Sequence, residues 1–204
     1  MDVPSPKLNA RQPGAKRRLK RALLPVLKPA LDRLLLWRGA IMARTGWKLR
    51  SGGFMVAHTA GRGLGLFVTR AYAPGERVIA ITGEPVAARG EYTIQTGPDA
   101  QLYPSAPLRY ANHSCEPNVG IRSDAQGQPA FHAMRALRAG EEVLWDYCMS
   151  ELELVIDGKP AGFTCRCGAP GCRGEVAGWR HAPAEVQQRY REWIMPYLRD
   201  RDGT

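Results

Sequence analysis

The chain has 204 residues, of which 44% are hydrophobic, enough for one compact core but not for two domains of ordinary size. Its formal net charge of +10 suggests a nucleic-acid-binding protein until the charges are located. Residues 1–50 hold 13 Lys and Arg against 2 Asp, whereas residues 51–204 hold 16 basic and 17 acidic side chains. The basic character therefore belongs to an N-terminal arm, and a strongly basic folded domain is excluded.

Residues 1–52 are predicted to form a basic, partly disordered arm. The first 15 or so residues are rich in Pro and nearly free of apolar side chains, a composition typical of disorder. Beyond Pro29, the apolar residues Leu31, Leu34, Leu35 and Met42 recur at helical spacing, which predicts an amphipathic helix. Such a helix either packs on the folded domain or meets a membrane surface or an acidic partner, and both interpretations stay open.

The leucine-rich stretch of residues 23–42 is interpreted as neither a signal peptide nor a membrane span. Charged residues and two prolines interrupt it, at Pro25, Lys28, Pro29, Asp32, Arg33 and Arg38. A spanning helix needs about 20 consecutive, predominantly apolar residues. Ser51-Gly52-Gly53, at the end of this region, is interpreted as a hinge into the folded domain.

From residue 53 onward, short β-strands separated by Gly and Pro turns are predicted. The predicted strands are residues 54–58, 65–68, 77–82, 92–95, 119–122, 130–133 and 142–146. Turns are predicted at Pro74-Gly75, at residues 82–85 and at residues 97–99. A final helix is predicted over residues 184–198, where apolar side chains recur at helical spacing. This pattern favours a mostly β architecture.

The five cysteines do not fit a framework of disulfides. Their number is odd, and three of them lie within eight residues as Cys165-x-Cys167-x4-Cys172. The pattern indicates a metal site in a reducing, intracellular compartment. A structural zinc centre needs four N or S ligands, so a fourth must come from elsewhere in the chain. The candidates are Cys115, Cys148 and the histidines at positions 58, 113, 132 and 181.

Three motifs precede this cluster in the chain. They are Gly61-Arg62-Gly63-Leu64-Gly65-Leu66-Phe67, Arg109-Tyr110-Ala111-Asn112-His113-Ser114-Cys115-Glu116-Pro117-Asn118, and Gly140-Glu141-Glu142-Val143-Leu144-Trp145-Asp146-Tyr147. In this order, and followed by the cysteines, they resemble the SET-domain protein lysine methyltransferases with a zinc-binding post-SET segment. The resemblance covers roughly residues 54–178.

The resemblance implies a fold and a division of the chain. The fold would be one of short curved sheets with a pseudoknot, in which the central motif is threaded beneath a later segment. The SET domain would span residues 53–150, the post-SET zinc segment residues 151–178, and a C-terminal helix residues 179–204.

The resemblance also implies the roles of individual residues. The methyl donor S-adenosylmethionine would be held by Arg62, Gly63, Leu64, Gly65, Tyr92, Asn112, His113 and Tyr147. Tyr147 and Tyr92 would be catalytic, lining a channel for the lysine side chain. Taken alone, His113 would be a hydrogen-bonded core histidine and Tyr92 a buried strand tyrosine. The family usually has an aromatic residue for packing at the position of Tyr110.

The reaction implied is an in-line displacement on a sulfonium methyl group by a neutral lysine amine. An unperturbed lysine has a pKa of about 10.4, so the channel must exclude water to lower it, and the Tyr147 hydroxyl can orient the amine. Cys115 would join Cys165, Cys167 and Cys172 as the fourth ligand of a structural Zn²⁺. Cys148 would be a small buried hydrophobe.

Ala80-Ile81 stands where the family often has Glu-Tyr, which changes the substrate side of the site. The interpretation is an S-adenosylmethionine-dependent methyltransferase acting on a protein lysine, with an arm that meets nucleic acid or an acidic surface. The expected location is intracellular and cytoplasmic, or chromatin-associated or nuclear in a eukaryote. The alternative is a catalytically silent SET-like binding module recruited through the arm, which Ala80-Ile81 favours. A zinc-structured nucleic-acid binder is disfavoured by the nearly neutral charge of residues 51–204.

Overall fold

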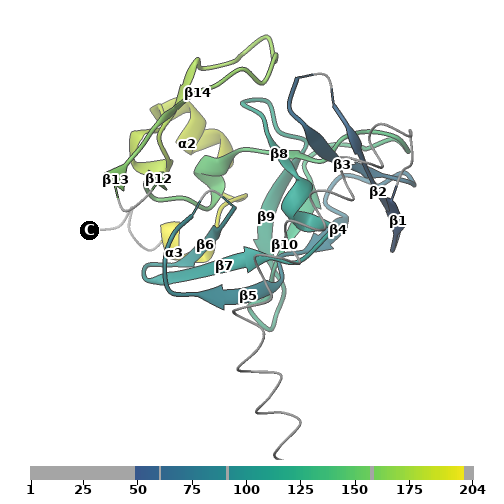
Figure 1. Cartoon of the computed structure of the whole chain (residues 1–204), viewed down its shortest axis with the longest axis horizontal. Coiled ribbons are helices and arrows are strands. Elements are labelled where there is room, and N and C mark those ends of the chain that lie inside the picture. The colour runs from purple at the N-terminus through teal and green to yellow at the C-terminus, as the bar shows by residue number, and fades with distance from the viewer. Residues whose placement is uncertain (1–48, 60, 91, 157–158, 200–204) are drawn as a thin grey trace, which may run out of the picture. The chain divides into compact units, whose positions relative to one another are not determined.

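Short strands separated by turns make up most of the part of the chain that the structure describes, as the spacing of Gly and Pro predicts (Figure 1). The structure is a computed structural model that describes residues 49–59, 61–90, 92–156 and 159–199. The predicted disordered segment and arm helix lie outside these residues. In the described ranges, none of the helices has the length and apolar character that crossing a bilayer would require.

The described elements include five short helical segments. The strands are β1 (Leu49–Ser51), β2 (Phe54–His58), β3 (Leu64–Val68), β4 (Arg77–Ala80), β5 (Gly83–Val86), β6 (Ile94–Gly97), β7 (Ala100–Pro104), β8 (Asn112–His113), β9 (Val119–Ser123), β10 (Pro129–Ala133), β11 (Leu144–Trp145), β12 (Val155–Ile156), β13 (Lys159–Pro160), β14 (Phe163–Thr164) and β15 (Glu175–Val176). The helices are α2 (Ala184–Tyr190) and α3 (Pro196–Arg199), with 3₁₀ turns η1 (Leu108–Tyr110), η2 (Tyr147–Met149) and η3 (Trp179–His181).

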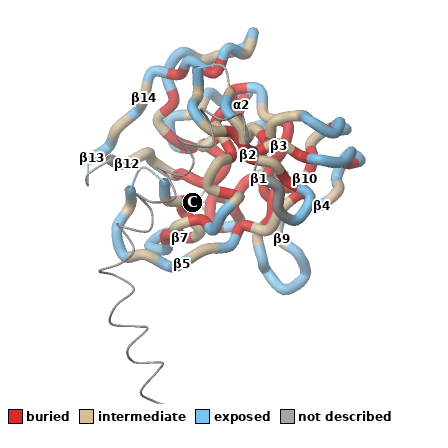
Figure 2. The backbone as a smooth tube through the Cα atoms, turned by 45° about the vertical axis from the view of Figure 1, so that its right-hand side comes forward, coloured by how far each residue is buried: buried red, intermediate tan, exposed pale blue. Residues whose placement is uncertain are grey.

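Within these residues the strands form three sheets of three strands and three pairs. The sheets have the orders β1-β2-β3, β4-β10-β9 and β5-β7-β6, and the pairs are β8–β11, β12–β13 and β14–β15. Alternate side chains of the sheets point inward, so that Leu66, Val119, Ile121 and Phe131 are completely buried. The buried stretches gather in the interior, and the exposed stretches are mainly loops and turns (Figure 2). The mostly β fold class is thereby confirmed.

The predicted strands at residues 54–58, 119–122 and 130–133 agree with β2, β9 and β10 to within one residue at each end. The hinge predicted at Ser51-Gly52-Gly53 is wrong. Gly52 and Gly53 have φ of 55° and 87°, and they form the tight turn that pairs β1 with β2, Ser51 opposite Phe54. Two consecutive residues with positive φ are typical of the hairpin turn that suits strand twist.

The turn predicted at residues 82–85 is also incorrect, because Gly83–Val86 forms β5. This strand lies at the edge of its sheet, where Pro85 removes no hydrogen bond that a further strand would need. Gly83 faces Pro104 so closely that a Cβ would lie 2.0 Å from the carbonyl oxygen of Tyr103. The turn predicted at residues 97–99 is confirmed as the connection between β6 and β7.

The C-terminal helix is interrupted, in contrast to the continuous helix predicted over residues 184–198. It divides into α2 and α3 because Pro196 has no backbone N–H and disfavours helical geometry at the preceding residue. The interruption lets the backbone N–H of Met195 donate to the carbonyl oxygen of Met149, and the backbone N–H of Ile121 to that of Trp193. The C-terminal segment thus contacts both η2 and β9.

The central motif is joined to the later Gly140–Tyr147 motif by the parallel pair of β8 with β11. Asn112 lies opposite Leu144, and His113 opposite Trp145. The side chain of Asn118, which is buried, also links the two motifs. Its Nδ2 donates to the carbonyl oxygen of Glu142 at 2.7 Å, and its Oδ1 accepts the backbone N–H of Leu144 at 2.9 Å. An asparagine can satisfy both groups because its amide carries a donor and an acceptor.

Asn118→Ala is therefore expected to lower the free energy of unfolding by about 2–4 kcal/mol, because two half-buried backbone groups lose their partners. Urea unfolding measures this, with an unchanged m-value indicating that two-state behaviour is kept. Gln126→Ala, in an exposed turn, serves as the control and should change stability by less than about 0.5 kcal/mol. A loss at Asn118 no larger than at Gln126 would contradict this role.

Candidate active site and metal centre

The glycine loop before and within β3 contains two residues that require glycine for their backbone geometry. Gly61 and Gly63 have φ of 88° and 70°, a region that favours glycine, and no atom lies within 4 Å of a Cβ built on either. Gly65 is different: a Cβ there would lie 2.5 Å from Thr59 Cγ2 and 2.6 Å from Glu142 Oε1. The free space beside this loop is therefore at Gly61 and Gly63, while the side chain of Glu142 occupies the space beside Gly65.

Glu142 connects the glycine loop to the central motif. Its Oε2 accepts from Arg62 Nη2 at 2.6 Å, and its Oε1 accepts from Asn112 Nδ2 at 2.8 Å. Asn112 Nδ2 also donates to the carbonyl oxygen of Leu64 at 3.0 Å. Both amide hydrogens of Asn112 are thus used within the protein, which leaves its Oδ1 to accept a hydrogen bond from a ligand. Sequence reasoning assigned no role to Glu142, although it lies within a quoted motif.

Arg62 also reaches the cysteine-rich segment. Its Nη1 donates to the carbonyl oxygen of Cys167 at 2.9 Å, while its Nη2 forms the ion pair with Glu142. The guanidinium is therefore engaged by the protein on both sides. The backbone N–H of Arg62 also donates within the protein, to Thr59 Oγ1 at 3.1 Å. The predicted contact of Arg62 to S-adenosylmethionine would therefore have to come from its carbonyl oxygen or from Nε.

His113 is buried beside the aromatic residue of the later motif. Its Nδ1 accepts the backbone N–H of Tyr147 at 3.3 Å, and its Nε2 lies 3.5 Å from Cys115 Sγ. Burial lowers the pKa of His113 to about 4, although Asp146 acts in the opposite direction, so the imidazole is neutral at physiological pH. The neutral ring then carries its proton on Nε2, directed at the sulfur. Both ring nitrogens have protein partners, so only the main chain of His113 is available to bind S-adenosylmethionine.

Tyr147 is half-buried and surrounded by rings from different parts of the chain. Its ring centroid lies 4.9 Å from His113, 4.9 Å from Trp145 and 6.0 Å from Phe163. Phe163 belongs to β14, in the segment that carries the cysteines, and sequence reasoning missed it because a single phenylalanine carries no motif. The arrangement brings an aromatic residue of the cysteine segment against Tyr147.

Tyr92 is not a buried strand tyrosine. It lies in the turn before β6, which begins only at Ile94, and is 54% exposed. Its exposure permits contact with a ligand, so its predicted place in a lysine channel stays a prediction. Tyr110, at the end of η1, packs against the core as expected.

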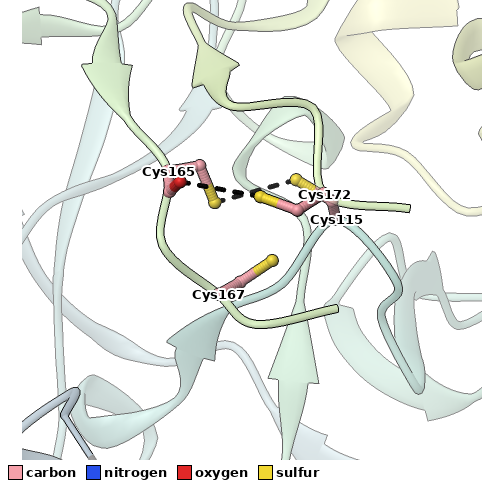
Figure 3. A group of neighbouring side chains, drawn as sticks. All are labelled: Cys115, Cys165, Cys167 and Cys172. Carbon is pink, nitrogen blue, oxygen red and sulfur yellow. Dashed lines mark hydrogen bonds between the residues drawn. The ribbon is translucent and has the colours of Figure 1, made fainter. Parts of the chain in front are cut away.

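The cysteine cluster is assembled as predicted. Figure 3 shows the sulfurs of Cys115, Cys165, Cys167 and Cys172 converging, and their ligand atoms all lie within 4.8 Å of one another. The sulfurs of Cys115 and Cys165 are 3.7 Å apart. Tetrahedral zinc with bonds of about 2.3 Å would hold its sulfurs about 3.8 Å apart. Among the described residues, the remaining candidates for the fourth ligand, Cys148 and the histidines, lie outside the cluster. Cys148 is buried, as expected.

The chemistry of these thiols also suits a cation. Burial raises the pKa of the Cys115 and Cys165 thiols. Burial acts in the same direction on Cys167, but hydrogen bonds from the backbone of Cys115 and Ala169 outweigh it and lower the pKa of Cys167 to about 6. Metal ligation requires thiolates. The positive charge of a bound cation would stabilise the thiolates of Cys115 and Cys165, whose pKa values are raised in its absence.

Comparison with known proteins supports this arrangement. Residues 63–148 match the SET domain family. This stretch of the chain is therefore similar to the SET domain. The matched stretch contains Gly63, Leu64, Gly65, Tyr92, Asn112, His113, Cys115 and Tyr147, whereas Cys165, Cys167 and Cys172 follow it in the chain.

The chain is similar to proteins of fungi and animals. Methyltransferase flvH of Aspergillus flavus is 30% identical over 119 residues, which are 58% of this chain and 62% of flvH. Histone-lysine N-methyltransferase EHMT1 of Homo sapiens is 35% identical over 105 residues, 48% of this chain and 8% of EHMT1. Histone-lysine N-methyltransferase ash1 of Drosophila melanogaster is 38% identical over 73 residues, 34% of this chain and 3% of ash1. The chain thus covers less than two thirds of each relative.

The structure brings two groups of predicted site residues together around the SET domain. In the first group, Asn112 donates to the carbonyl oxygen of Leu64, and Glu142 accepts from both Asn112 and Arg62. His113, Tyr147 and the cysteine cluster form the second group, linked by the His113 ring. The parallel pairing of β8 with β11 connects the two groups.

Proposed function

We propose that the chain transfers methyl groups from S-adenosylmethionine to lysine side chains of a protein substrate. The observation that carries the proposal is the β8–β11 junction, which holds Asn112 and His113 alongside the strand that leads directly into Tyr147. The relatives ash1 and EHMT1 are histone-lysine N-methyltransferases. The residues to which the resemblance assigns donor binding and catalysis thus lie in one connected arrangement.

The chemistry requires a neutral amine close to the sulfonium methyl group. The amine lone pair forms the new C–N bond while the C–S bond breaks, its electron pair stays on sulfur, and the product ammonium releases a proton to solvent. The rings of Trp145, Tyr147 and Phe163 exclude water near the nucleophile, which favours the neutral amine. The Tyr147 hydroxyl then orients the amine for in-line attack.

S-adenosylmethionine would lie beside the open backbone of Gly61 and Gly63. The amide hydrogens of Asn112 would not bind it, because both are already donated within the protein. Asn112 Oδ1 is the acceptor available to the donor's ammonium group. A structural Zn²⁺ held by the four cysteines would fasten the segment that carries Phe163 to the central motif. Such a closed four-ligand site supplies folding energy and takes no part in the methyl transfer.

The arm of residues 1–50 is proposed to recruit the substrate. Its surplus of 11 positive charges attracts an acidic protein or one bound to nucleic acid, in an intracellular compartment. Binding to duplex DNA should weaken steeply as salt increases if the arm contacts phosphates. A full-length variant with Lys16, Arg17, Arg18 and Lys20 changed to Gln should then bind less tightly and show a smaller salt slope.

The proposal is tested by incubating the zinc-loaded chain with labelled S-adenosylmethionine and mixed cell lysate, followed by mass spectrometry of modified lysines. Labelled methyl-lysine that disappears when the chain is omitted supports the function. The alternative of a catalytically silent module predicts captured protein without methyl-lysine. Absence of methyl-lysine from every lysate, with donor binding demonstrated, would reject the proposed activity.

Asn112→Ala is expected to weaken donor binding by roughly tenfold or more, because it removes the acceptor for the donor's ammonium group. Calorimetric titration with S-adenosylmethionine measures the change in Kd. Gln126→Ala again provides an exposed control with unchanged Kd. An Asn112→Ala protein that folds and binds the donor with normal affinity would show that this side chain does not contact it.

A further inference from the structure

A buried ion pair connects the cysteine segment to the residue that precedes Tyr147. Asp146 is completely buried, and both of its carboxylate oxygens accept from the guanidinium of Arg173: Nη1 donates to Oδ2 at 2.6 Å and Nη2 to Oδ1 at 2.9 Å. The Arg173 side chain is itself only 13% exposed. A bidentate pair of this kind restricts the relative orientation of its partners as well as their separation.

Asp146 determines the start of the turn that carries Tyr147. It is the N-cap of η2, and its Oδ1 accepts the backbone N–H of Cys148 at 3.1 Å. Tyr147 is the first residue of this turn, so its position follows the orientation of the Asp146 carboxylate. The same carboxylate oxygen lies 3.8 Å from Nδ1 of His113, which accepts the backbone N–H of Tyr147.

Arg173 is equally tied to the cysteine cluster. It directly follows Cys172, and its backbone N–H donates to Cys115 Sγ at 3.4 Å. A backbone donor at a metal-ligand sulfur is the kind of outer contact that orients a ligand. One residue therefore contacts a cluster thiol with its main chain and the carboxylate before Tyr147 with its side chain.

We propose that Arg173 is a positioning residue, which uses Asp146 to hold Tyr147 in the orientation needed for methyl transfer when the cysteine segment is in place. Its kinetic consequence rests on the proposed methyltransferase function. Its structural consequence, the position of the Tyr147 ring, concerns the chain itself and is measurable without turnover. The His113 ring provides a second link between Cys115 and Tyr147, so loss of Arg173 should misplace the ring rather than release it.

Arg173→Met is expected to lower kcat by about 10- to 100-fold, because a displacement of about 1 Å at a reacting group costs roughly that much. The KM values for S-adenosylmethionine and substrate should stay within about threefold, since the Arg173 side chain is only 13% exposed and its guanidinium is committed to Asp146, and zinc content should stay at one per chain. Arg173→Lys keeps the charge but not the bidentate geometry and should fall between wild type and Arg173→Met. Arg166→Met removes an exposed arginine between two cysteines of the same segment and should match wild type.

The second measurement is ¹⁹F NMR of zinc-loaded protein with 3-fluorotyrosine incorporated only at position 147. The resonance should shift or broaden in Arg173→Met, with an unchanged resonance in Arg166→Met. Because removing Arg173 alone leaves a buried carboxylate unpaired, Arg173→Met combined with Asp146→Asn provides a variant without that unpaired charge. If the single variant does not fold, the double variant decides the question with the same two measurements.

An unchanged resonance together with unchanged kcat, in a folded variant that lacks the Arg173 side chain, would overturn the proposal. A reduced kcat with an unchanged resonance would also overturn it, because Arg173 would then act by another route. If the wild-type chain transfers no methyl group at all, the proposed function fails, and the fluorine resonance alone still confirms or rejects the positioning role.

Discussion

Cys115→Ser is expected to remove most of the bound zinc and the methyl-transfer activity together. Losing an outer-shell partner typically costs 10- to 100-fold in metal affinity, so losing one of four thiolate ligands should cost at least about 100-fold. Without the metal, the cysteine segment would keep contacts such as the Arg173–Asp146 ion pair and the Arg62 hydrogen bond to Cys167, but it would lose the folding energy of the closed four-ligand site. Zinc per chain by elemental mass spectrometry, and methyl transfer on the same samples, measure the two effects.

The matched control is Cys148→Ala, because Cys148 is buried near the same segment but lies outside the cluster. That variant should keep one zinc per chain. Full zinc occupancy in Cys115→Ser would show that the fourth ligand is another residue. Loss of zinc with full retention of methyl transfer would show instead that the cysteine segment does not contribute to the active site.

Tyr147→Phe is expected to slow methyl transfer by about 100-fold or more while the donor Kd changes by less than about threefold. The ring would still pack against His113, Trp145 and Phe163, but no hydroxyl would orient the amine. Single-turnover rates on a substrate identified from lysate, together with titration of the donor, separate the two effects.

Tyr72→Phe serves as the control, since Tyr72 is buried beside Arg70 and pairs through its backbone with Leu137, outside the segments that form the site. It should retain the wild-type rate. A normal rate for Tyr147→Phe would refute the catalytic assignment. A large loss of donor affinity in that variant would assign the hydroxyl to donor binding rather than to orientation of the amine.

The order of motifs along the chain was sufficient to predict the similarity to the SET domain and the four clustered cysteines. Cys165-x-Cys167-x4-Cys172 leaves a tetrahedral site incomplete, and Cys115 was named for the fourth position by the resemblance of the central motif. Chemistry that depends on residue type and short spacing can be recognised in this way. Most of the predicted strands followed for a similar reason, because alternation and turn residues are local features.

Predictions from local composition were wrong where pairing with another strand determined the conformation. Residues 82–85 have the composition of a turn, but β7 provides a partner that makes them the edge strand β5. Ser51-Gly52-Gly53 resembles a hinge, yet the pairing of β1 with β2 makes it a hairpin turn. The apolar periodicity of residues 184–198 predicts one continuous helix, but Pro196 interrupts it and α3 begins there.

The residue types of the site are predictable from local sequence, because the cysteines, Asn112, His113 and Tyr147 all belong to recognisable motifs. The side chains that these residues contact depend on the fold. Glu142 between Arg62 and Asn112, Phe163 against Tyr147, and Arg173 on Asp146 are partners separated by 16 to 80 positions. No local spacing predicts such contacts, because they depend on how β8 and β11 pair and how the cysteines draw the later segment onto them.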